Sequence, residues 1–151
     1  GHVLANAGID ASNIEGGDRG RVLLWPQDPD SSAREIRKGI AAITGMTIGV
    51  VIADSMGRAW RIGTVGGAIG CAGLVVIDDK RGAAQDLSGR VLQATVIAVA
   101  DSSAGRGVLA VGEGDEGTPA VLVRGADRWV REEDGPGASS GVRPAEQDMF
   151  R

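Results

Sequence analysis

The chain has 151 residues, a length that suits one domain, and 42% of them are hydrophobic, which is enough for a buried core. Its net charge of −4 and pI near 5.0 argue against the basic surface that nucleic-acid-binding proteins normally carry. The single cysteine excludes an internal disulfide, and no apolar run approaches the ~18 residues of a membrane span. We therefore expect a cytoplasmic protein with no nucleic-acid or membrane partner.

Two short apolar segments near the start, Val3–Ala7 and Arg21–Trp25, are predicted strands, and Pro26 ends the second one. The letters DPDSSAREIRKGIAAITG that follow predict a helix. Ser32 and Glu35 have the spacing of a capping box, with Asp28 or Asp30 as alternative caps. The helix carries one apolar stripe, formed by Ile36, Ile40 and Ile43.

The rest of the chain reads mainly as strands. The clearest is Thr47–Ala53, which is continuous, β-branched and followed by Asp54. Glycines crowd the stretch Gly63–Gly73, which predicts a loop with closely packed backbone. Further strands are predicted at Leu74–Ile77, Val91–Ala100 and Ala120–Val123. The expected fold is α/β (mixed α+β), a glycine-rich mixed sheet with few helices.

Composition divides the chain near residue 130. Residues 1–130 contain all the predicted strands and the helix, and they form the expected core domain. Residues 131–151 are rich in charge, Gly, Pro and Ser, a composition that buries too little apolar surface to order itself. We therefore expect residues 131–151 to be a flexible tail or a linker.

Three carboxylates, Asp10, Asp54 and Asp101, directly follow apolar segments. Ligands gather at the carboxyl ends of parallel strands, and Mg²⁺ prefers carboxylate oxygens together with phosphate and water. The three aspartates are therefore candidate metal ligands. The alternative for each is an aspartate that only begins a turn by bonding nearby backbone N–H groups.

Asp54 is the best candidate of the three because of its neighbours. Ser55 adds a hydroxyl ligand, and Arg58 and Arg61 could neutralise a triphosphate beside the metal. A simple turn with two surface arginines explains the same letters equally well. The glycine-rich stretch lacks the phosphate-binding GxxxxGK[ST] pattern, and Cys71 reads as a small core residue.

Four strings in order carry a family resemblance: NAGIDASN, LLWPQDPDSSA, VVIADSMGRAWRIGTVGGAIGCAGL and EGDEGTPAVLVRG. The chain resembles the coenzyme F420-0:L-glutamate (γ-glutamyl) ligase family, ligase domain, without the family's N-terminal portion. The resemblance implies that GTP activates the carboxylate of F420-0 as an acyl phosphate, which the amine of L-glutamate then attacks. It also implies Mg²⁺ or Mn²⁺ at the site, with K⁺ as a further candidate ion.

By position in these motifs, the resemblance implies Asp10, Asp54 and Ser55 at the metal and Asn13 near the nucleotide. It implies a homodimer that pairs through an interwoven sheet, and a fused or separate nitroreductase-like domain after the ending RPAEQDMFR. No catalytic residue is assigned.

One departure bears on activity. The family commonly has Glu where this chain has Ser102, and Ser cannot supply a carboxylate. Asp101 would then take over, or the second metal would be weak, or activity would be lost. The alternatives to an active glutamate ligase are a degenerate or truncated nucleotide-binding or structural domain, and a related ligase with another acceptor. The divergent segment Asp78–Arg90 motivates the last of these.

Overall fold

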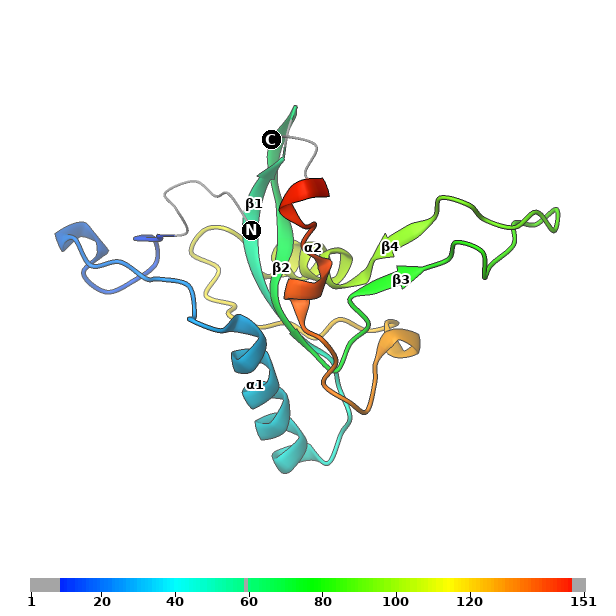
Figure 1. Ribbon diagram of the computed structural model, residues 1–151. Helices are drawn as coiled ribbons and strands as arrows, with labels where there is room; N and C mark the ends of the chain where they lie inside the picture. Colours follow the sequence, from blue (N-terminus) through cyan, green and yellow to red (C-terminus); the bar gives the residue numbers. More distant parts are fainter. Residues whose placement is uncertain (1–8, 59, 148–151) are drawn as a thin grey trace.

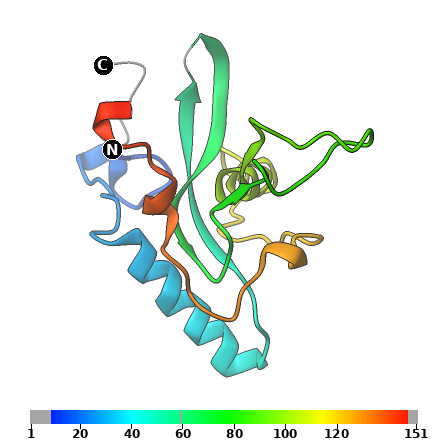
Figure 2. The same ribbon diagram turned by 45° about the vertical axis from the view of Figure 1, so that its right-hand side comes forward.

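The computed structural model of the chain describes residues 9–58 and 60–147. The strand predicted at Val3–Ala7 lies outside the described residues. The mixed α+β class is confirmed: helices α1 and α2 lie on opposite sides of a long β1–β2 hairpin, and a second hairpin, β3–β4, projects away from it (Figures 1 and 2). In the described part of the chain, no helix is both long and apolar enough to cross a membrane.

Helix α1 spans Pro29–Thr44, close to its predicted bounds. The cap is Asp28 rather than Ser32: its side chain accepts the N–H of Ser31 at 2.9 Å. Gly45 ends the helix in the left-handed conformation at φ 69°. The predicted apolar stripe does not face the core, because Ile36 and Ile43 are 48% and 86% exposed.

Strands β1, Val50–Arg58, and β2, Arg61–Ala72, pair in antiparallel register. The loop predicted at Gly63–Gly73 is therefore wrong, since this stretch is most of the longest strand. Close packing explains its glycines: a Cβ at Gly66 would lie 2.5 Å from the backbone oxygen of Ala104, and one at Gly70 would lie 2.3 Å from that of Pro29. Glycine thus lets both helices approach the strand backbone.

The long strand predicted at Val91–Ala100 is also wrong. Only Val96–Ala98 forms a strand, β4, which pairs antiparallel with β3, Ile77–Asp79. Helix α2 begins at once and spans Val99–Val111, so Asp101 lies in its first turn. Val and Ala are compatible with both strand and helix. Here the helix forms because one of its faces is buried against β2.

Two other predicted strands form little or no ladder. Within Arg21–Trp25 only Leu23 makes a bridge, to Asp10, and Ala120–Val123 has no strand partner among the described residues. Leu74 makes one bridge with Val130. The described residues also contain four short 3-10 helices: η2 Gly17–Arg19, η3 Asp127–Trp129, η4 Ala138–Gly141 and η5 Ala145–Gln147.

The core lies between β2, α2 and the segment after residue 131, and it is built from small side chains: Ala68, Cys71, Leu74, Val76, Val99, Ala100, Ala104 and Ala138. Asp30, only 8% exposed, accepts the N–H of Cys71 at 2.9 Å and that of Ala138 at 2.7 Å. Arg37 of α1 also bonds Asp134 at 2.6 Å. Asp134 and Ala138 thus connect this segment to α1 and to the core beside β2 (Figure 1), while the expectation of a flexible tail or linker over residues 131–151 stays a prediction.

Candidate functional site

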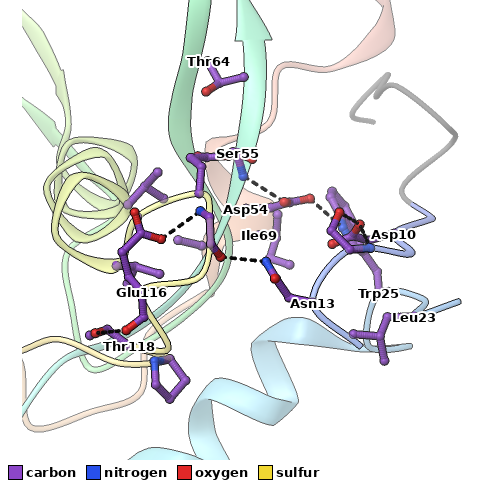
Figure 3. A pocket seen from close by; sticks show the side chains of 18 of the residues that line it. Asp10, Asn13, Leu23, Trp25, Asp54, Ser55, Thr64, Ile69, Glu116 and Thr118 are labelled. Atoms are coloured by element: carbon purple, nitrogen blue, oxygen red, sulfur yellow. Dashed lines mark hydrogen bonds between the residues drawn. The ribbon is translucent and has the colours of Figure 1, made fainter. Parts of the chain in front are cut away.

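A pocket of about 1410 Å³ opens between three segments: the loop around residues 9–26, the middle of β1 with its partner β2, and residues 112–119 after α2. Its volume exceeds the range of about 300–1,000 Å³ that is usual for small-molecule pockets. Five of the predicted site residues line it: Asp10, Asn13, Asp54, Ser55 and Arg58. The hairpin supplies the rigid floor, and the two loops form its sides (Figure 3).

Asp54 does not follow a strand but lies within β1, opposite Gly67. The indole N–H of Trp25 donates to its Oδ2 at 2.8 Å, and the N–H of Ser55 donates to its Oδ1 at 2.8 Å. Figure 3 shows this carboxylate facing the loop that carries Trp25 and Asp10. Because β1 and β2 are antiparallel, the parallel-strand argument for an aspartate at this place was wrong, although the aspartate itself does line the pocket.

Asp10 is held by its own loop. Its Oδ1 accepts the N–H of Ser12 at 2.8 Å and the Ser12 hydroxyl at 2.5 Å. The hydroxyl and then the backbone hydrogen bond from Ser12 lower the pKa of Asp10, so the carboxylate is charged at neutral pH. The backbone of Asp10 also exchanges two hydrogen bonds with Leu23, which fixes the two ends of the loop together.

Asn13 connects two sides of the pocket. It has a left-handed backbone with φ 52°, which asparagine tolerates better than most residues. Its side-chain amide donates to the carbonyl oxygen of Gly114 at 2.9 Å, across 101 positions of sequence. The first loop and the loop after α2 are therefore attached to each other directly at the pocket (Figure 3).

Arg58 lines the pocket, and its guanidinium donates to the carbonyl oxygen of Ile62 at 2.9 Å, near the tip of the hairpin. The two remaining predicted residues, Arg61 and Asp101, lie outside the lining. Asp101 Oδ1 instead accepts the N–H of Ala68 at 2.9 Å and so attaches α2 to β2. Asp101 lies in the first turn of α2 and outside the pocket lining, and its role as a metal ligand stays a prediction.

Sequence reasoning missed Trp25 and the acidic loop after α2. This loop places three further carboxylates on the pocket, those of Glu113, Asp115 and Glu116. Glu116 bonds the N–H of Gly114 at 2.8 Å. The sequence signal that could have indicated this loop was three acidic residues among glycines. Ser102 is exposed on α2 and does not line the pocket.

The lining carries five carboxylates and one guanidinium, so a polyanion can bind only with cations. Within residues 9–58 and 60–147, no three Asp, Glu, His or Cys side chains converge as a ready metal site. The donor set still suits Mg²⁺ or Mn²⁺, because it consists of oxygen atoms and such ions take one or two carboxylates plus phosphate. Asp10, Asp54 and Ser55 are the residues that would hold the ion.

The fold and the pocket define a mixed α+β domain with a large pocket that carries five carboxylates. The chain belongs to the F420-0:Gamma-glutamyl ligase family, whose model matches residues 1–125.

Three relatives illustrate the similarity, each a coenzyme F420:L-glutamate ligase. That of Methanopyrus kandleri is 43% identical over the whole chain and 59% of its own length, and that of Methanocaldococcus jannaschii is 44% identical over the whole chain and 57% of its own length. That of Archaeoglobus fulgidus is 50% identical over 83% of the chain and 49% of its own length. The chain and its matched part thus span 49–59% of the length of these relatives.

Proposed function

We propose that the chain is the core of a ligase that adds L-glutamate to coenzyme F420-0, using GTP and a divalent cation. The observation that carries the proposal is the pocket itself. The family's motif positions Asp10, Asn13, Asp54 and Ser55 come from separate segments, yet all of them line it. Membership of a family of glutamate ligases supplies the reaction class.

The proposed reaction has two steps. The terminal phosphoryl group of GTP passes to a carboxylate oxygen of F420-0, which gives an acyl phosphate and GDP. The amine of L-glutamate then attacks the acyl carbon, phosphate leaves with the bonding electron pair, and the amine loses a proton to give the amide. A bound divalent cation would neutralise the phosphate oxygens during the first step.

The protein residues serve mainly to bind and orient. Asp10 and Asp54 would hold the cation together with the Ser55 hydroxyl, and the guanidinium of Arg58 would face the phosphate charge that the cation leaves unbalanced. Asn13 would act on the nucleotide by fixing the two loops around it. K⁺ is a further candidate ion for the acidic loop, whose carboxylates exceed the needs of one divalent cation.

The proposal also covers the oligomeric state, the cellular location and a partner domain. A homodimer accounts for apolar side chains that are exposed in one copy, such as Leu24, Ile43 and Ile62. It also accounts for two-stranded sheets with unpaired edges, which are marginal by themselves. We further propose a cytoplasmic location and, from the resemblance of the ending RPAEQDMFR, a nitroreductase-like partner domain.

The direct test is turnover with GTP, Mn²⁺, F420-0 and L-glutamate, followed by mass spectrometry of the deazaflavin. We expect one glutamate added for each GDP and phosphate released, and no coupled GTP consumption without F420-0. Release of GDP with a different acid as acceptor would instead indicate a related ligase.

One observation favours the second candidate, a nucleotide-binding domain without catalysis: Ser102 replaces the family's glutamate. Calorimetry with GDP and Mn²⁺ separates the two candidates. Binding with no turnover would favour the second candidate, and absence of binding would leave only a scaffold.

A further inference from the structure

Both oxygens of the Asp54 carboxylate are fixed by donors from different segments. Ser55 contributes its backbone N–H to Oδ1, and Trp25 contributes its indole N–H to Oδ2, each at 2.8 Å. A carboxylate oxygen has two lone pairs, so each oxygen keeps one for a cation. The two hydrogen bonds therefore set the orientation of the carboxylate without exhausting its capacity to bind metal.

Trp25 also determines where the loop with Asp10 lies relative to β1. It comes two residues after Leu23, which is bridged to Asp10, and its half-buried indole lines the same pocket. The hydrogen bond from Trp25 to Asp54 thus joins the loop with one candidate cation ligand to the strand with the other. Removing the indole N–H would leave the carboxylate held by the Ser55 N–H and would remove this attachment of the loop to β1.

We propose that Trp25 is a positioning residue for the cation site: its indole N–H holds Asp54 in the orientation that binds the divalent ion and keeps the Asp10 loop against β1. This inference rests on the proposed function, because it takes the pocket to bind a divalent cation. Partners that orient a metal-bound carboxylate typically contribute tenfold or more to metal affinity. Phenylalanine would keep most of the aromatic surface but has no donor.

The test compares Mn²⁺ affinity, measured by the electron paramagnetic resonance signal of free Mn²⁺, in Trp25→Phe and in the unchanged chain. The matched control is Trp129→Phe, because Trp129 also donates its indole N–H to an aspartate, Asp78, at 2.9 Å, outside the pocket. We expect Trp25→Phe to weaken Mn²⁺ binding by about tenfold and Trp129→Phe to leave it unchanged. A merely structural indole hydrogen bond would lower thermal stability in both variants without this difference.

A second measurement does not depend on how Trp25→Phe folds. In a Trp60→Phe/Trp129→Phe chain, the remaining emission comes from Trp25, and paramagnetic Mn²⁺ bound at Asp54 should quench it whereas Mg²⁺ should not. Equal Mn²⁺ affinity in Trp25→Phe and the unchanged chain, or the absence of quenching on Mn²⁺ binding, would overturn the role of Trp25 alone. If the unchanged chain bound no Mn²⁺, this result would contradict both the cation site of the proposed function and the role of Trp25.

Discussion

The Asp101 carboxylate accepts the backbone N–H of Ala68 at 2.9 Å and so attaches the first turn of α2 to β2. The register of the hairpin shifts beside Ala68, between Ile52 and Ala53 on the opposite strand. Asp101 thus satisfies a backbone donor at an irregular point of the ladder. Its contribution is to the fold, whereas that of Asp54 is to the pocket.

This contrast gives the first prediction. Asp54→Asn keeps an oxygen that can accept the Trp25 N–H but removes the charge, so we expect Mn²⁺ affinity to fall by at least about tenfold. Asp101→Asn makes the same chemical change outside the pocket and should leave Mn²⁺ affinity unchanged. Calorimetric titration of both variants measures the difference. Equal losses in the two variants would show that the site has been assigned to the wrong aspartate.

The second prediction concerns the glycines of β2. Gly66→Ala would place a Cβ 2.5 Å from the backbone oxygen of Ala104, and neither strand nor helix can move away cheaply. We expect a loss of about 3 kcal/mol in the free energy of unfolding, measured with urea. Gly57→Ala is the control, because a Cβ there meets no atom within 4 Å, and its effect should stay below about 1 kcal/mol.

The third prediction concerns the buried carboxylate of Asp30. Asp30→Ala would leave the N–H groups of Cys71 and Ala138 without their acceptor, so we expect a loss of about 2–5 kcal/mol in the free energy of unfolding. Asp28→Ala, which removes only the exposed cap of the same helix, should cost about 1 kcal/mol. A smaller loss for Asp30→Ala than for Asp28→Ala in urea titrations would contradict this role.

The fourth prediction is the pH dependence of that stability. Burial opposes ionisation of Asp30, but the N–H groups of Cys71, Ala138 and Ser139 outweigh it and lower the pKa below the ordinary 3.8. A depressed pKa in the folded state means that the stabilisation is complete above pH 3.8 and is lost as pH falls through the folded value. Acid titration of the unfolding free energy should show this loss in the unchanged chain and less of it in Asp30→Asn.

The fifth prediction concerns Cys71, which is 1% exposed. Burial, and then the nearby Asp30 charge, raise the pKa of its thiol to about 11. At pH 8 the native protein should therefore not react with a disulfide reagent such as DTNB, since the nucleophile is the thiolate. In 8 M urea one equivalent should react. Rapid reaction of the native chain would contradict this and show that the core around Cys71 opens to solvent.

The sequence predicted the bounds of α1 well because its start is marked locally by Asp28, one of the caps considered. It missed β2 because only the approach of Ala104 and Pro29 explains why glycines are needed in a strand. Likewise, nothing local distinguishes a strand from a helix at Val99, since valine and alanine fit both. Tertiary contacts decided each of these elements.

Some residues of the site were likewise predicted from the sequence, and others were missed. Asp54 stood out because Ser55 and Arg58 are its neighbours in the sequence, whereas Asp10 had only its place after an apolar segment and the family resemblance. Trp25 could not be assigned, because its hydrogen bond to Asp54 spans 29 residues and the intervening helix hides their proximity. The acidic loop was visible as a charge cluster, but its position over the pocket depends on the length and direction of α2.

The hydrogen bonds from residues 138 and 139 to Asp30 span 108 and 109 positions of sequence. On the ribosome, α1 is therefore synthesised long before its buried carboxylate can obtain all its donors. Until residues 138 and 139 have emerged, Asp30 has only the Cys71 N–H among its three backbone donors, and water must satisfy the rest of the carboxylate. A pause in translation shortly before residue 138 would therefore leave the Asp30 carboxylate without two of its backbone donors.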